Sequence, residues 1–310
     1  MQLILPHVEL LKPQFDETSV WAHVVRCAQT CYKVDKEVTD PWAWISEHLL
    51  KNEPQHCSPL EHGTFYLTIT LDSTEASLTK DDQWGRKMTI VDFYEKNKYS
   101  HVNVHFSDHT TGVTYYITTN GRVIVENNRF DDLDFLTKPF KRHEKRYTLR
   151  FTCDIGVSRE ANRHRTISPS EQSTRYCNYS RDRFGNELSV VLPTDLFDVP
   201  ADQLVPADHL TYCQSLLMRK GPQWQPLDWW FYANLACETA YMNLIRLGWK
   251  PQQARRILPL DTQTEVVYTA FEKDWNHFLY LRDDKAAHPD MRFLARQVRD
   301  LLRDEMAKYK

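Results

Sequence analysis

The spacing of apolar and polar residues predicts a chain of mixed helices and strands. Residues 17–32 carry apolar side chains at helical spacing, and residues 41–51 begin with a proline preceded by an aspartate, a pair that suits a helix start. Residues 65–71 alternate apolar and polar side chains, which predicts a strand with one buried face. The first 71 residues therefore predict two helices followed by a strand.

The middle of the chain has a more β-rich pattern. The dipeptide Asn120-Gly121 lies between two β-rich runs, and these two residues tolerate the positive φ angles of a type I′ turn. A β-hairpin is therefore expected within residues 73–146, which look like an insertion. Residues 147–152 predict a further strand, and Ser158 is a candidate N-cap of a short helix that carries the following arginines.

The last third predicts helices at about 228–247, 265–282 and 289–308. Gly248 follows the first of them, in the position where a glycine commonly ends a helix.

Composition is that of an ordinary globular protein. The chain has 310 residues, of which 41% are hydrophobic and 26% charged, and its formal net charge of −3 does not favour nucleic acid as a partner. No apolar run is long enough to span a bilayer, and the N-terminal residues lack a basic leader. Seven scattered cysteines favour reduced thiols. We therefore expect a cytoplasmic protein without a membrane anchor.

Cationic residues concentrate in one segment, residues 141–183, which has eleven basic and five acidic residues and a local charge of +6. A solvated surface, a nucleic-acid patch and a site for small anions are all open interpretations. Arginine outnumbers lysine there, which suits bidentate recognition of phosphate or carboxylate. The eight glycines form neither a dinucleotide-binding motif nor a phosphate loop, so a nucleotide or flavin would be held by side chains and helix ends.

Two further chemistries are weakly signalled. His56 and His62 flank Glu61, but the spacing is not that of a zinc protease, so no metal site is expected. Ser173 lacks an obvious base with an orienting partner, which disfavours a nucleophile and leaves a substrate-binding role.

The arginine-rich stretch carries a resemblance. Arg163-His164-Arg165, followed after seven residues by Ser173, resembles the signature of the flavin-dependent thymidylate synthases. Other segments resemble further motifs of that family in the same order: 28–32, 56–69, 240–264, 277–282 and 291–295.

The resemblance implies a fold and an activity. The fold would be α+β, with a helical framework around a central mixed or antiparallel sheet, forming one domain over residues 1–310 with 73–146 as a family-atypical insertion. The activity would be reductive methylation of dUMP to dTMP, with methylenetetrahydrofolate as carbon donor, NADPH as reductant and FAD as hydride carrier. The protein would be a homotetramer with active sites at subunit interfaces. The alternative is an FAD- and nucleotide-binding protein on this scaffold without methylation activity.

The resemblance also implies residue roles. The implied catalytic residues are Arg163, Arg175 and Arg292. The implied FAD-binding residues are His56, Ser58, Glu61, Arg163, His164, Arg165, His277 and Arg282. The implied dUMP-binding residues are Glu160, Glu171, Gln172, Ser173, Thr174, Arg175, Arg255 and Arg292, with Arg255 donated by a neighbouring subunit. Glu160, Ser170 and Tyr280 depart from residues frequent in the family.

Overall fold

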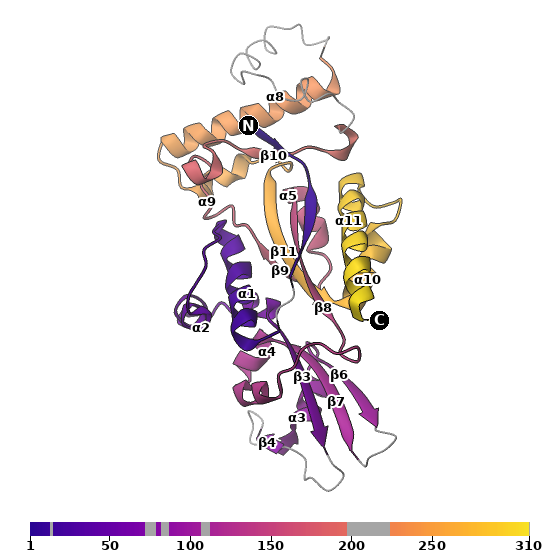
Figure 1. Cartoon of the computed structure of the whole chain (residues 1–310). Coiled ribbons are helices and arrows are strands. Elements are labelled where there is room, and N and C mark those ends of the chain that lie inside the picture. Colours follow the sequence, from indigo (N-terminus) through magenta and orange to yellow (C-terminus); the bar gives the residue numbers. More distant parts are fainter. Residues whose placement is uncertain (13–14, 72–78, 82–86, 107–111, 197–223, 310) are drawn as a thin grey trace.

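A four-stranded antiparallel sheet forms the centre of the computed structural model (Figure 1). Its strand order is β2 (His7–Leu11), β8 (Arg146–Asp154), β11 (Gln263–Phe271) and β9 (Ser168–Glu171). The structure describes residues 1–12, 15–71, 79–81, 87–106, 112–196 and 224–309; Cys213 and parts of the 73–146 segment lie outside these ranges. The sheet and the helices around it confirm the expected α+β class.

Helices cover both faces of the central sheet. Helices α10 (Glu272–Arg282) and α11 (Pro289–Met306) share a hydrophobic core with one face, and α1 (Glu17–Gln29) contacts the other. Strand β11 is buried on both sides, because Val266 packs toward α10 and α11 while Val267 contacts Cys27 of α1. Its apolar run therefore has no two-residue alternation, and the helix expected at 265–282 is wrong over its first seven residues.

A second antiparallel sheet contains much of the expected insertion. Its order is β3 (Thr64–Leu71), β7 (Val113–Asn120) and β6 (His101–Phe106). Short helices α3 (Ile90–Lys96) and α4 (Gly121–Glu126) pack with it, and one hydrophobic core joins these elements to α1. Segment 73–146 thus supplies two of the three strands of this sheet and is built into the body of the protein.

The expected hairpin at Asn120-Gly121 is wrong, because a strand passes directly into a helix there. Asn120 has a φ of −128° and its side chain accepts a hydrogen bond from the Val123 backbone, so it caps α4. A Cβ on Gly121 would lie 2.8 Å from the Leu60 carbonyl oxygen and from the Trp21 ring. The glycine therefore permits close packing rather than a turn. Antiparallel pairing in this region joins β6 to β7 instead.

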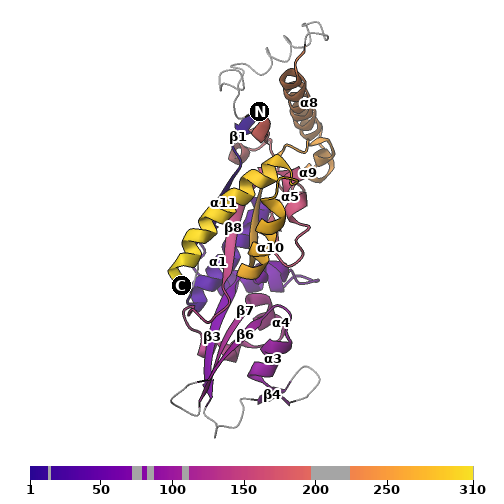
Figure 2. The same ribbon diagram turned by 90° about the vertical axis from the view of Figure 1, so that its right-hand side faces the viewer.

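The remaining elements lie around these two sheets. Strand β1 (Gln2–Ile4) pairs in parallel with β10 (Ser189–Val191), and the long helix α8 (Pro226–Arg246) packs on them. Figure 2 shows α8 extending away from the central sheet. Gly248 follows α8 with a φ of +96°, as expected for a helix end. The short elements are α2 (Pro41–Ile45), a π turn (Ser46–Leu50), β4 (Thr79–Asp81), β5 (Lys87–Thr89), α5 (Ile155–Ala161), α9 (Pro251–Ala254) and 3-10 turns η1 (Thr30–Tyr32), η3 (Ser58–His62), η4 (Phe130–Phe135), η5 (Asp182–Phe184), η6 (Thr194–Leu196), η8 (Arg255–Ile257) and η9 (Ala307–Tyr309).

Candidate active site

The arginine-rich stretch follows α5 instead of forming part of it. Asp154 is the N-cap, since its carboxylate accepts a 2.7 Å hydrogen bond from the Val157 amide. The helix therefore begins four residues before the expected start, and Ser158 lies inside it. Arg163 and Arg165 come after the helix end and are exposed in the connection to β9. The prediction that a helix carries these arginines is wrong, because the earlier aspartate caps it.

Glu171, at the end of β9, is held by three hydrogen-bond donors. The hydroxyl of Ser158 donates to one carboxylate oxygen over 2.7 Å, and Thr264 donates to the same oxygen over 3.2 Å. The side-chain amide of Asn162 donates to the other oxygen over 3.3 Å. These donors come from α5, β11 and the turn after α5, so the carboxylate has a fixed orientation.

A polar pocket opens beside Glu171, with a volume of about 540 Å³. Its lining is Ile155, Ser158, Arg159, Glu171, Gln172, Ser173, Thr174, Arg255, Arg256, Leu258, Pro259 and Leu260. The guanidinium of Arg255 donates to the Thr174 hydroxyl over 3.4 Å. Residues 81 positions apart thus meet within one chain, so Arg255 reaches this pocket without a neighbouring subunit. Three arginines around the pocket suit an anionic ligand.

A second pocket, the aromatic pocket, has a volume of about 580 Å³. Its lining is Ala28, Gln29, Cys31, Tyr32, Val34, Lys36, Glu37, Val38, Trp44, His48, Leu49, His56, Ser58, Pro59, Ser173 and Tyr176. The Tyr32 and Tyr176 rings lie 5.2 Å apart, and the Trp44 and His48 rings stack 4.4 Å apart. Flat aromatic walls suit a planar ring system.

Ser173 belongs to both pockets, so the two adjoin. Its backbone amide donates to the Cys31 carbonyl over 2.9 Å, which ties the loop after β9 to the end of α1. The Arg175 amide donates to its hydroxyl over 3.3 Å. The Arg175 side chain itself is exposed, 5.3 Å from the Tyr176 ring centre, and is not part of either lining.

A separate group of residues surrounds His164, and we name Glu160, His164, His277 and Arg282 the His164 cluster. The Arg282 guanidinium donates to the His164 ring over 2.9 Å and to the Glu160 carboxylate over 3.1 Å. The rings of His164 and His277 lie 6.1 Å apart. Burial, then the charges of Arg282 and His277, lower the pKa of His164 to about 4, so it is neutral at pH 7.

The His164 cluster belongs to the lining of neither pocket. Glu160, expected at the nucleotide, forms an ion pair with Arg282. Arg292 lies in the first turn of α11 and is likewise outside both linings. Glu61 accepts hydrogen bonds from Arg122 over 2.7 Å and Ser168 over 2.6 Å.

Sequence reasoning did not assign several residues of the two pockets. Arg159 of the polar pocket was read only as part of a charged segment, and Trp44 and His48 carried no signal. Tyr32 lies in the 28–32 motif, which could have indicated it. Tyr176 lines the aromatic pocket, whereas the nearby Tyr179 is 3% exposed and packs in the core.

Residues 142–306 match the model of the family described as thymidylate synthase complementing protein. The chain belongs to this family. Its members are flavin-dependent thymidylate synthases, so this chain is an enzyme of that class. The match covers the polar pocket and the His164 cluster, whereas His56, Ser58 and Glu61 precede it.

Two crystal structures of the flavin-dependent thymidylate synthase ThyX from Helicobacter pylori, both with FAD and dUMP, are similar to the chain. They are 19% and 18% identical to it; each comparison covers 53% of this chain and 70% of the other, with a TM-score of 0.37. A likeness this low transfers no residue positions. No curated protein sequence matches the chain.

The described part of the chain offers neither a metal site nor a membrane span. It contains no group of three or more histidine, cysteine, aspartate or glutamate side chains that could hold a metal ion. None of its helices combines the length and apolar character needed to cross a bilayer.

Proposed function

We propose that this thymidylate synthase methylates dUMP to dTMP, with methylenetetrahydrofolate as carbon donor, NADPH as reductant and FAD as the tightly bound hydride carrier. The observation that carries the proposal is the junction of the polar and aromatic pockets at Ser173. A nucleotide in one pocket and a planar ring in the other would meet there.

The polar pocket is proposed to bind dUMP. Its arginines, Arg255 foremost, would hold the phosphate, and Gln172, Ser173 and Thr174 would supply the loop around the nucleotide. Three donors already occupy Glu171, while a carboxylate has about four acceptor positions. The remaining position would accept an N–H of the uracil ring. Arg175 and Arg292 are proposed as further substrate contacts from outside the pocket lining.

The aromatic pocket fits the planar ring of a flavin or folate. Tyr32 and Tyr176 offer stacking surfaces, and His56 and Ser58 offer polar contacts at its edge. When bound, FAD supplies the hydride chemistry that protein side chains lack. The protein would orient the rings and exclude water around them.

We further propose that Arg163, His164, Arg165, His277 and Arg282 contact FAD on a neighbouring subunit. These residues contribute to neither pocket of their own chain. Arg282 is held by two partners, His164 and Glu160, so its guanidinium is a fixed cation. A fixed cation would stabilise negative charge that develops on a bound cofactor. Glu61, bonded to Arg122 and Ser168, is proposed as an acceptor at the same cofactor.

The test is to purify the protein, record its visible spectrum and then measure tritium release from [5-³H]dUMP with methylenetetrahydrofolate and NADPH. We expect a flavin spectrum and tritium release that needs both co-substrates. A protein that binds no FAD after reconstitution contradicts the proposal. A flavin-bound protein without tritium release supports the binding-only alternative.

A further inference from the structure

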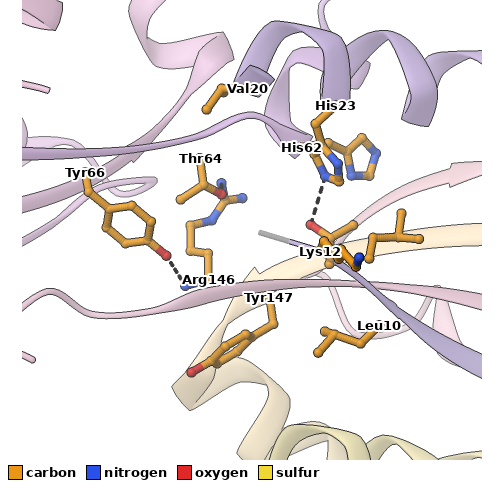
Figure 3. A pocket seen from close by; sticks show the side chains of 11 residues that line it. Leu10, Lys12, Val20, His23, His62, Thr64, Tyr66, Arg146 and Tyr147 are labelled. Atoms are coloured by element: carbon orange, nitrogen blue, oxygen red, sulfur yellow. Dashed lines mark hydrogen bonds between the residues drawn. The ribbon is translucent and has the colours of Figure 1, made fainter. Parts of the chain in front are cut away.

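A small cavity lies between α1, η3, the end of β2 and the starts of β3 and β8. Its volume is about 30 Å³. The lining consists of Leu10, Leu11, Lys12, Val20, His23, His62, Thr64, Tyr66, Arg146, Tyr147 and Thr148. Figure 3 shows Arg146 between Tyr66 on one side and the two histidines on the other. The lining has two cationic side chains and no carboxylate.

Arg146 is a buried cation whose hydrogen bonding is incomplete. The residue is 7% exposed, and its two terminal nitrogens donate to the Thr64 hydroxyl over 3.1 Å and the Glu61 carbonyl over 2.9 Å. Its Nε atom is buried and has no hydrogen-bond partner in the described part of the chain. Both protein acceptors are neutral. Burial lowers the pKa of Arg146 to about 10, and Tyr66, Glu61 and Asp274 oppose this shift only in part, so the buried cation is incompletely compensated.

The two histidines of the cavity are held in their neutral form. His62 is hydrogen-bonded through both ring nitrogens, to Thr269 over 2.8 Å and Ser170 over 2.9 Å. Burial lowers its pKa well below the usual value, and the nearby charges of His23 and Arg146 lower it further. Burial, Arg26, Arg146 and Arg150 lower the pKa of His23 to about 4. Neutral histidines add no charge to the cavity, so Arg146 remains its buried cation.

We propose that this cavity binds one small monovalent inorganic anion of chloride size, which accepts a hydrogen bond from Arg146 Nε. A cavity needs roughly 10–15 Å³ of this kind of space for one water, so about 30 Å³ admits a halide but not a sulfate, a phosphate or an organic anion. The anion would neutralise Arg146, the first residue of β8, where the 73–146 segment ends. It would therefore stabilise the junction of the two sheets, independently of the reaction.

The test compares urea unfolding of the wild-type protein in sodium chloride, sodium bromide and sodium gluconate at equal ionic strength. An anion that binds only the folded state raises the unfolding midpoint saturably. We expect this rise with either halide and not with gluconate. Equal midpoints in halide and gluconate overturn the proposal.

Two variants and a crystal structure test whether the halide response comes from this cavity. Arg146→Met should lose the halide response, whereas Arg150→Met, which removes another largely buried arginine of β8 outside the cavity lining, should keep it. Loss of the response in both variants contradicts the site. Should Arg146→Met not fold, crystals of the wild-type protein grown in bromide decide. An anomalous peak within hydrogen-bond distance of Arg146 Nε supports the proposal, and a peak-free cavity refutes it.

Discussion

Arg255 is the residue best placed to hold an anionic group in the polar pocket, because it reaches Thr174 from the turn after α9. Removing a charge-assisted hydrogen bond costs about 1.5–3 kcal/mol, and partial exposure reduces this. Arg255→Ala should therefore weaken dUMP binding about tenfold or somewhat more, with FAD content unchanged. Isothermal titration with dUMP and the flavin absorbance measure the two quantities.

The matched control for Arg255 is Arg246→Ala. Arg246 is an exposed arginine at the end of α8 that donates to Asn243 and does not line the pocket. Its loss should leave dUMP affinity unchanged. Equal weakening by both variants would assign the effect to general electrostatics instead of a specific contact.

His164 should make stability depend on pH. Its pKa of about 4 in the folded protein lies below the value of about 6.5 expected when unfolded. The unfolded state therefore binds more protons between these values, and the stabilisation is complete above pH 6.5 and is lost as the pH falls toward 4. His164→Gln retains an acceptor for Arg282 but cannot titrate. As the pH is lowered from 7 to 5, the free energy of unfolding of this variant should therefore decrease less than that of the wild-type protein.

Urea unfolding at pH 7, 6 and 5 measures this difference. One histidine contributes at most about 1.4 kcal/mol per pH unit. The control is His48→Asn at an exposed position on the π turn, which should follow the wild-type slope. A wild-type slope in His164→Gln would show that other groups carry the pH dependence.

At the scale of elements, η3 and β9 are clamped by two adjacent side chains. Glu61 accepts from Ser168, and His62 bonds Ser170 two positions along the same strand. Ser170, one of the positions that depart from the family, thus faces the interior and not the polar pocket. The clamp fixes the strand that ends in Glu171.

Breaking the two halves of the clamp should have unequal effects. Ser170→Ala leaves a ring nitrogen of the 1% exposed His62 unpaired, which costs about 1–3 kcal/mol of unfolding free energy. Ser168→Ala should cost less, because Glu61 is partly exposed and keeps Arg122. Combining Ser170→Ala with His62→Leu should cost less than the sum of the single changes, whereas strict additivity would argue against the clamp.

Local sequence patterns predicted an element correctly where the pattern is typical of only one kind of structure. The first helix, the Asp40 cap of α2 and the end of α8 at Gly248 are confirmed. The hairpin prediction at Asn120-Gly121 is wrong because this dipeptide suits two structures. It can form a tight turn, or the asparagine can cap a helix while the glycine leaves room for closely packed neighbours, as it does here. Residues 265–271 were misread because a strand buried on both faces looks like an apolar helix segment.

The candidate site was predictable only where a motif spans it. The sequence motifs indicated Glu171 to Thr174 and Arg255, and the structure brings them into one pocket. The lining of the aromatic pocket brings together residues far apart in the chain, such as Trp44 and Tyr176, and no local pattern reveals this. The charge of the 141–183 segment likewise gave no sign that Arg282 would fix Glu160.

At the scale of the whole molecule, the proposed site residues form two separate groups, the polar pocket and the His164 cluster, and this separation can be tested. In the proposed assembly, the polar pocket of one subunit acts together with the His164 cluster of a neighbouring subunit. Glu171→Ala impairs one half of the site and Arg282→Ala the other. Each variant alone should be nearly inactive in tritium release, with every site carrying one defect.

Co-expression of the two variants under different affinity tags tests the division. Random assembly in equal amounts leaves about a quarter of the sites with both halves intact, so activity of the doubly purified oligomer should recover toward that fraction. Sites formed within one chain would all keep a defect, and no activity would return. Mixing Glu171→Ala with Arg255→Ala is the control, because both changes lie in the same pocket of one chain and no intact site can form.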